Sequence, residues 1–153
     1  MRDKDGISAA VAFADLAATA RAAGRTVVDD LDRAAREVGV HATRQVSARF
    51  DTPDRLPAVM AGLRQRPPRE LARFGVERVD DLAAGSAGLP PTDGLRFQLG
   101  AHRVTIRPSG TEPKIKAYLE VVLPASADDP AAGRREAAGY LSEIEDAVQS
   151  LLA

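Results

Sequence analysis

The amino-acid sequence predicts an α+β domain, in which an antiparallel sheet of four to five strands carries two helices on one face and follows a two-helix N-terminal segment. Runs in which apolar and polar residues alternate predict the strands, because successive side chains of a strand point to opposite faces. Apolar residues that recur at helical spacing predict the helices. From residue 40 onward the predicted order is β-α-β-β-β-β-α, which is typical of the α+β class.

The composition excludes several classes of protein. Of the 153 residues, 44% are hydrophobic, and the net charge is −1 with both signs well mixed, so a broad nucleic-acid surface is not expected. The absence of cysteine excludes disulfide scaffolds and thiolate metal sites and fits a reducing cytoplasm. No apolar run reaches the roughly 20 residues that span a bilayer, and no signal peptide is recognisable. We therefore expect a cytoplasmic protein without a nucleic-acid or membrane partner.

The first element is a helix over residues 7–23, with Asp5 as its N-cap. A second helix begins after the N-cap Thr26 and ends at Gly39. Its apolar stripe consists of Val27, Leu31, Ala34 and Val38. Two helices of this length cannot enclose a core of their own. Residues 1–39 are therefore expected to be the end of a larger unit, docked loosely on the domain that follows.

A strand over residues 40–50 comes next, with Arg44 as the one polar residue on its apolar side. Thr52 and Pro53 then predict the N-cap and first residue of a helix, which ends at Arg66 before two prolines. The remaining predicted elements are a short strand over 76–82, a Gly- and Pro-rich loop over 84–94, strands over 95–99, 102–107 and 114–121, and a C-terminal helix opened by Asp129 and Pro130.

The loop between the last two strands carries the functional signal. The sequence from Arg107 to Lys116, RPSGTEPKIK, places a guanidinium, two hydroxyls, a glycine and two ammonium groups within ten residues. The Ser-Gly-Thr segment can turn its backbone N–H groups toward an anion, and Arg107 can bind two phosphate oxygens at once. Two interpretations fit: a phosphate-binding loop, or a polar hairpin loop that happens to be basic. A P-loop is excluded, because its glycine-lysine spacing is absent and a strand follows.

Strand parity favours the phosphate interpretation. If the two strands pair around residues 108–113, Arg107, Lys114 and Lys116 fall on the same polar face of the sheet. Like charges at such positions repel each other by roughly a few tenths of a kcal/mol per close pair. A bound anion would relieve this repulsion.

The motif Arg-Pro-Ser-Gly-Thr-Glu-Pro, followed by a basic residue and a strand, resembles the phosphate-binding loop of the α-D-phosphohexomutases, which include phosphoglucomutase, phosphomannomutase and phosphoglucosamine mutase. The continuation Lys-Ile-Lys-Ala-Tyr-Leu is most similar to the bacterial phosphoglucomutase/phosphomannomutase branch. Residues 3–10 resemble the start of the closing helices of that family's third domain, and residues 75–82 and 89–90 resemble the run into its fourth. The resemblance implies that residues 1–39 end domain three and residues 40–153 form domain four.

The resemblance implies a four-domain phosphotransferase of carbohydrate metabolism that converts hexose 1-phosphate to hexose 6-phosphate through a hexose 1,6-bisphosphate. A phosphoserine in domain one and Mg²⁺ in domain two carry the chemistry, and domain four clamps the phosphate that does not react. This chain lacks both a Thr-Ala-Ser-His stretch and an Asp-Gly-Asp-x-Asp loop. We therefore expect it to hold no metal or cofactor, to need domains one to three as partners, and to be inactive alone. Capping and solvation explain its carboxylate pairs, which are Asp29-Asp30, Asp80-Asp81 and Asp128-Asp129.

The resemblance assigns residues of this chain to phosphate binding and none to catalysis. The candidates are Arg107, Ser109, Gly110, Thr111 and Lys116, with Lys114 as a further participant. Glu112 is expected to point away from the anion and to pair with an arginine. Tyr118 can either line the sugar site or pack against a neighbouring strand. His41 and His102 are isolated and are interpreted as structural residues.

Two alternatives remain beside the mutase hypothesis. One is a stand-alone module that binds phosphate or sugar phosphate, and the other is a truncated fragment without an independent role. An open reading frame that continues upstream into the catalytic motifs would favour the mutase, whereas an upstream stop codon and ribosome site would favour the stand-alone module.

Overall fold

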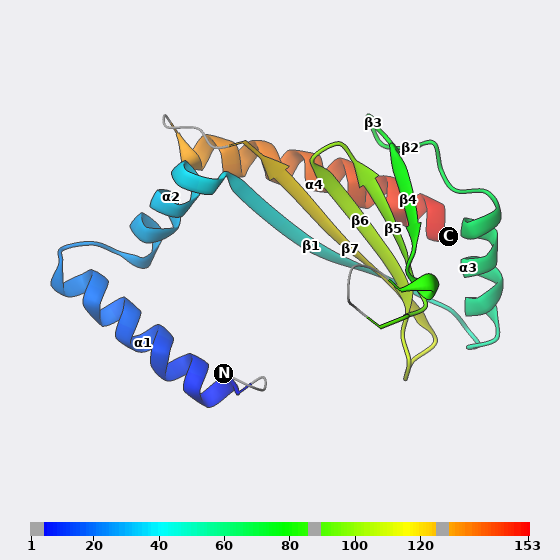
Figure 1. The fold of residues 1–153 in the computed structure, drawn as a ribbon, viewed down its shortest axis with the longest axis horizontal. Helices are drawn as coiled ribbons and strands as arrows, with labels where there is room; N and C mark the ends of the chain where they lie inside the picture. Colours follow the sequence, from blue (N-terminus) through cyan, green and yellow to red (C-terminus); the bar gives the residue numbers. More distant parts are fainter. Residues whose placement is uncertain (1–4, 86–89, 125–128) are drawn as a thin grey trace.

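The structure is a computed structural model that describes residues 5–85, 90–124 and 129–153 (Figure 1). The first two residues of the 3–10 segment, Leu89 of the 89–90 segment, Asp128 and part of the predicted 84–94 loop lie outside the described residues. The helices and strands are α1 (Gly6–Ala22), α2 (Val27–Val38), β1 (Val40–Arg49), α3 (Arg55–Gln65), β2 (Glu70–Leu71), β3 (Phe74–Gly75), β4 (Arg78–Asp81), a 3-10 turn (Leu82–Ala84), β5 (Leu95–Leu99), β6 (His102–Pro108), β7 (Lys114–Leu123) and α4 (Pro130–Leu152).

Five strands form one antiparallel sheet in the order β1-β7-β6-β5-β4, which confirms the predicted α+β class. The long strands β1 and β7 pair over ten residues, from Val40 opposite Leu123 to Arg49 opposite Lys114. This pairing makes β7 a central strand, fixed on one side by β1 and on the other by β6. The two short strands β2 and β3 form a separate hairpin that the sequence did not predict.

The hydrophobic core lies between one face of the sheet and the helices α4 and α3 (Figure 1). Alternate residues of β5, β6 and β7 are buried there, as the period-two patterns predict. α4 begins at Pro130 behind the N-cap Asp129, whose carboxylate accepts a hydrogen bond from the N–H of Ala132 at 2.9 Å. Its buried stripe includes Ile144 and Val148, which are both 0% exposed. From α3 the core receives Leu56, Met60 and Leu63.

Arg44, the misfit on β1, forms an ion pair with Glu145 of α4 at 2.5 Å. The side chain therefore lies on the helix-covered face of the sheet, as the alternation of β1 requires, and ends on a carboxylate at the edge of the core. A charged residue is tolerated on the apolar side of β1 because its guanidinium reaches a carboxylate at the edge of the core.

The predicted start of α3 is wrong by two residues. Thr52 and Pro53 form a turn, and their carbonyl groups accept hydrogen bonds from the N–H groups of Arg55 and Leu56 at 3.5 and 3.1 Å. The helix begins at Arg55, so that Pro57 lies in its first turn. Had the helix begun at Pro53, Pro57 would lie in its second turn, where proline lacks the required N–H and clashes with the preceding turn. The predicted 76–82 strand is likewise shorter, because Asp81 caps the 3-10 turn that follows β4.

The N-terminal helices form as predicted. Asp5 caps α1, the capping box of Thr26 opens α2, and Gly39 with φ 93° ends α2. α1 extends away from the sheet (Figure 1), while an ion pair between Asp32 and Arg134 ties α2 to α4. Their large apolar side chains stay exposed, namely Ile7, Val11, Phe13, Leu16, Val28, Leu31 and Val38.

Candidate functional site

The loop over residues 108–113 lies at one end of the sheet, where it joins β6 to β7 (Figure 1). The register of this hairpin places Arg107 directly opposite Lys116. Both residues alternate with buried neighbours, so their side chains stand on the face of the sheet opposite α4. Lys114 precedes Lys116 by two residues and belongs to the same face. The predicted parity of these three cations is confirmed.

Backbone hydrogen bonds fasten the loop to the sheet. The N–H of Ser109 donates to the carbonyl of Lys114 at 2.8 Å, and the N–H of Lys114 donates to the carbonyl of Glu112 at 2.7 Å. On the other side, the N–H of Phe50 donates to the carbonyl of Pro113 at 2.8 Å, which ties the loop to the end of β1. The loop is therefore supported by two neighbouring strands.

The tip of the loop, by contrast, offers free donors. Within the described residues, the N–H groups of Gly110, Thr111 and Glu112 have no acceptor, and the hydroxyls of Ser109 and Thr111 have no hydrogen-bond partner. Gly110 does not adopt a positive φ, and a Cβ built on it meets nothing within 4 Å. The fold of the chain therefore does not demand glycine at this position, and what glycine provides is open space above the loop.

Glu112 forms an ion pair with one of the three cations, Lys114, and with Arg49 of β1. Its carboxylate lies 2.5 Å from Lys114 and 3.2 Å from Arg49. The hydrogen bond from Lys114 and the positive charges of both partners hold the pKa of the Glu112 carboxyl below its ordinary value. The expected arginine partner of Glu112 is thus confirmed. Its pairing with Lys114, whose side chain is only 14% exposed, was not predicted.

Arg107 and Lys116 differ from Lys114 in their partners. Among the described residues, neither has a carboxylate within ion-pair distance. Arg107 instead donates from Nη2 to the hydroxyl of Tyr118 at 3.0 Å, and its Cζ lies 5.4 Å from the centre of the Tyr118 ring. Packing against a neighbouring strand is one of the two roles that the sequence predicts for Tyr118, and this contact with β6 is of that kind, although Arg107 was not predicted as the partner. The register contains a signal for it, because Tyr118 is two residues beyond Lys116 and therefore diagonal to Arg107.

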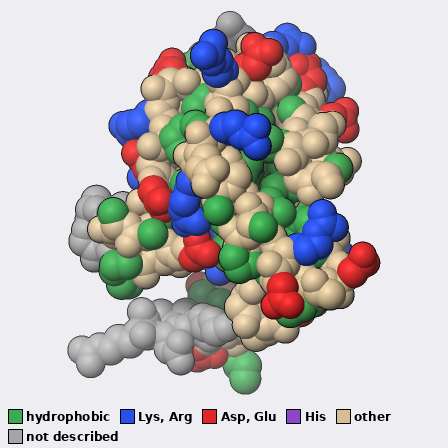
Figure 2. All heavy atoms as spheres, turned by 90° about the vertical axis from the view of Figure 1, so that its right-hand side faces the viewer, with side chains coloured by type: hydrophobic (Ala, Val, Ile, Leu, Met, Phe, Trp, Pro, Cys, Tyr) green, Lys and Arg blue, Asp and Glu red, His purple; other side chains and the backbone are tan. Residues whose placement is uncertain are grey.

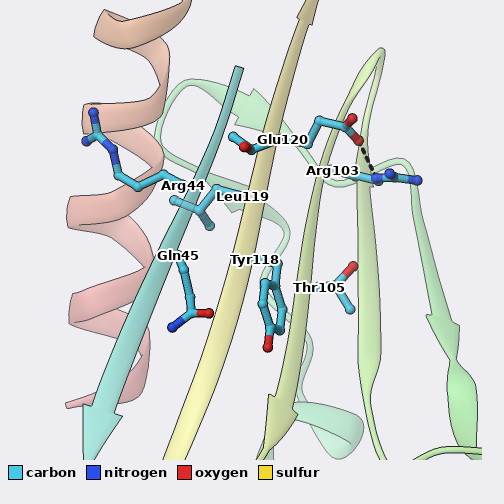
Figure 3. A pocket seen from close by; sticks show the side chains of 8 residues that line it. Arg44, Gln45, Arg103, Thr105, Tyr118, Leu119 and Glu120 are labelled. Atoms are coloured by element: carbon cyan, nitrogen blue, oxygen red, sulfur yellow. Dashed lines mark ion pairs between the residues drawn. The ribbon is translucent and has the colours of Figure 1, made fainter. Parts of the chain in front are cut away.

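A hollow of about 590 Å³ lies beside these groups, along the open face of β1, β7 and β6 (Figure 3). Six of the eight residues that line it belong to the open face by strand alternation, namely Thr43, Gln45, Arg103, Thr105, Tyr118 and Glu120, and the other two are Arg44 and Leu119. An ion pair joins Arg103 to Glu120 within it (Figure 3). The alternation of each strand predicts that these six side chains share a face, but the sequence does not predict that their lengths leave a depression.

The two histidines lie away from the loop. His102 is buried against the core, where its ring centre lies 4.8 Å from that of Phe74 and its Nδ1 accepts the N–H of Val122 at 3.2 Å. Burial lowers the pKa of His102 below its ordinary value. His41 lies on the open face with its Nδ1 3.7 Å from Glu120. His102 thus has a packing role, as the sequence predicted.

Charges of both signs are interspersed over the face that carries α3 (Figure 2). In the parts of the chain that the structure describes, no group of three or more histidine or carboxylate side chains can hold a metal ion. Asp29 and Asp129 cap helices, while Asp80 and Asp81 form ion pairs with Arg96 and Arg64.

No single described helix is long and apolar enough to cross a membrane. α1 and α2 taken together meet the length and composition criteria, across a bend of 94°.

The family described as "Phosphoglucomutase/phosphomannomutase, C-terminal domain" matches residues 51–137. A probable phosphomannomutase of Haemophilus influenzae is 36% identical over 154 residues, which cover 99% of this chain and 29% of that protein. A phosphopentomutase of Pongo abelii is 30% identical over 94% of this chain and 26% of its own length. A phosphoglucomutase of Staphylococcus aureus is 27% identical over 81% of this chain and 25% of its own length.

Among solved structures, the open form of parafusin, an exocytosis-sensitive phosphoprotein and phosphoglucomutase of Paramecium, superimposes with a TM-score of 0.54. The superposition covers 97% of this chain and 28% of parafusin, at 18% sequence identity, and therefore supports the fold alone. In all of these comparisons, the chain spans less than a third of the length of its relatives.

Proposed function

This chain belongs to the phosphoglucomutase/phosphomannomutase family, and we propose that its loop over residues 108–113, with Arg107 and Lys116 at the base, binds the phosphate group of a phosphosugar. One observation carries the proposal. In the described part of the chain, the loop combines backbone N–H groups and hydroxyls that have no partner with two cations that have no carboxylate. Phosphate oxygens match such a set of donors, and the charged donors make the strongest of these hydrogen bonds.

Each candidate residue has a role in this proposal. Arg107 binds two phosphate oxygens, the hydroxyls of Ser109 and Thr111 bind one each, Gly110 allows the ligand to approach the backbone, and Lys116 contributes a point charge. Lys114 is a weaker ligand than Lys116, because Glu112 already neutralises it.

The ligand in the proposal is a hexose phosphate or hexose 1,6-bisphosphate. The relatives are a phosphomannomutase, a phosphoglucomutase and a phosphopentomutase, so their names share the phosphate and differ in the sugar. The bound phosphate is the one that does not react. Its binding energy holds the sugar in place, so that the reacting end of the substrate meets groups outside this chain.

The remaining parts of the activity are assigned to other domains. In this proposal a cytoplasmic parent enzyme supplies the phosphoserine, the Mg²⁺ loop and the residues that recognise the sugar, and this chain alone does not catalyse the interconversion. The exposed apolar side chains of α1 and α2 support the assignment of residues 1–39 to the end of the preceding domain. Residues 40–153 then form the C-terminal phosphate-binding domain.

A titration of the full chain with inorganic phosphate and with glucose 6-phosphate tests the proposal. We expect both ligands to shift the backbone amide NMR signals of residues 109–111, and Arg107→Ala to weaken binding by about 1.5–3 kcal/mol, the contribution of a charge-assisted hydrogen bond. Arg103→Ala is the matched control, because Arg103 is an exposed arginine of the same strand that is paired with Glu120. Unshifted signals at residues 109–111, or equal losses in the two variants, would contradict the proposal.

A further inference from the structure

The phosphate-binding guanidinium has one protein partner among the described residues, and that partner is uncharged. Arg107 donates to the hydroxyl of Tyr118 at 3.0 Å and lies 5.4 Å from the ring centre. Lys114, on the next strand, is paired with a carboxylate instead. The difference matters for anion binding, because a carboxylate competes with phosphate for the cation, whereas a phenol holds the cation and leaves its charge in place.

Tyr118 has a firm base. It belongs to the central strand β7, where Gln45 of β1 and Thr105 of β6 flank it in register. The next residue of the strand, Leu119, is 1% exposed and anchors the strand in the core. The backbone of Tyr118 is thus fixed from both sides and from below.

The ring of Tyr118 leans in the direction of the loop. Figure 3 shows its hydroxyl pointing along the strands toward the end at which β1 finishes. This is the end at which Arg49 pairs with Lys114, beside the loop. The hydroxyl therefore reaches the pair formed by Arg107 and Lys116, which lies two residues closer to the loop along each strand than the pair formed by Thr105 and Tyr118.

We propose that Tyr118 is a positioning residue that holds the Arg107 guanidinium on the open face of the sheet, beside Lys116, before phosphate arrives. This inference rests on the proposed function of the loop and adds a cause for its affinity. An exposed arginine samples many rotamers, and a ligand that orders it must overcome the lost entropy. A partner that orders the side chain in advance, without neutralising it, removes part of that cost.

Two substitutions separate the contributions of the residue. Tyr118→Phe keeps the ring under the guanidinium and removes the hydroxyl, while Tyr118→Leu removes both. Tyr140→Phe is the matched control, because Tyr140 donates its hydroxyl to Glu136 on α4 and lies away from the loop. Urea unfolding of each variant checks that the fold is intact.

Two measurements on the full chain test the inference. The first follows the guanidinium NMR signals of Arg107, assigned through Arg107→Lys, without ligand. We expect hindered rotation with separate Nη signals in the wild type and averaged signals in Tyr118→Phe. The second is the affinity for inorganic phosphate, which we expect to fall roughly two- to tenfold in Tyr118→Phe and further in Tyr118→Leu, with no change in Tyr140→Phe.

The outcomes are distinguishable. Wild-type signals for Arg107 in Tyr118→Phe, or wild-type phosphate affinity in both Tyr118 variants while Arg107→Ala loses binding, would overturn the positioning role and leave the proposed function intact. No phosphate binding by the wild-type chain would overturn the proposed function, and the positioning role with it.

Discussion

Lys114 and Lys116 lie two residues apart on the same face of β7, yet the structure predicts unequal effects when their charges are removed. Lys116 has no carboxylate partner among the described residues, while Lys114 is held by Glu112 at 2.5 Å. Lys116→Met therefore removes a free charge, and a charge-assisted hydrogen bond to phosphate contributes about 1.5–3 kcal/mol. This corresponds to a loss of roughly 10- to 150-fold in phosphate affinity.

Lys114 needs a paired substitution, because Lys114→Met alone would leave the Glu112 carboxylate unneutralised by the lysine and close to the bound anion. The double variant Lys114→Met/Glu112→Gln removes both charges and leaves the net charge of the chain unchanged. We expect it to keep its phosphate affinity within about threefold of the wild type, because the two charges that it removes are opposite in sign and adjacent, so that their effects on a nearby anion largely cancel. Glu112→Gln alone should tighten binding, because it releases the charges of Lys114 and Arg49.

Calorimetric titration with glucose 6-phosphate at about 0.05 M salt measures these affinities while screening is weak. At higher salt, we expect the wild type to bind glucose 6-phosphate more weakly, and we expect the difference in affinity between the wild type and Lys116→Met to become smaller. A double variant that loses as much affinity as Lys116→Met would show that the Glu112 pairing does not withdraw Lys114 from the ligand, and the reasoning would be wrong.

Two further predictions concern stability. The free energy of unfolding should fall from pH 7 to pH 5, because burial lowers the pKa of His102 in the folded state. Above the unfolded-state pKa of about 6.5, His102 is neutral in both the folded and the unfolded chain. Below that pH the unfolded chain binds the proton first, which favours unfolding. His102→Leu should flatten this slope in urea unfolding, and an unchanged slope would exclude His102 as its source. Ile144→Ala, at a side chain that is 0% exposed, should lower the free energy of unfolding by about 2–5 kcal/mol. Leu31→Ala, at a side chain that is 59% exposed, should lower it by less than about 0.5 kcal/mol. Equal losses for the two variants in urea unfolding would contradict the burial of Ile144 and the exposure of Leu31.

The strands and their faces could be predicted because an alternation of apolar and polar residues indicates both that a segment is a strand and which of its side chains face the core. Ile115 and Leu119 point into the core, and this alone places Lys114, Lys116 and Tyr118 on the other face. The start of α3 was mispredicted because Thr52 and Pro53 are a strong local signal for a helix start. Pro57 is the residue that decides against it, since it must lie in the first turn.

Contacts between residues that are far apart along the chain could not be predicted from the sequence. Arg44 breaks the pattern of β1, and its partner Glu145 is 101 residues away, so that only the packed helix explains it. The hairpin of β2 and β3 has two-residue strands, which are too short to show a period, and it turns through Ala72 with a positive φ of 55°. No pattern of polar and apolar residues encodes such a turn at alanine.

For the candidate site, the sequence predicts which groups are present but not how they are partnered. The parity of the strands places three cations on one face, with Lys114 predicted only as a further participant beside Arg107 and Lys116. The partners of these cations could not be predicted, because they depend on how far each side chain reaches: Glu112 reaches Lys114 and Arg49, while Tyr118 reaches Arg107. Lys114 is thus held in an internal ion pair, while Arg107 and Lys116 have no carboxylate partner among the described residues. The contact of the Tyr118 ring and hydroxyl with the Arg107 guanidinium is the packing against a neighbouring strand that was one of the two roles predicted for this tyrosine.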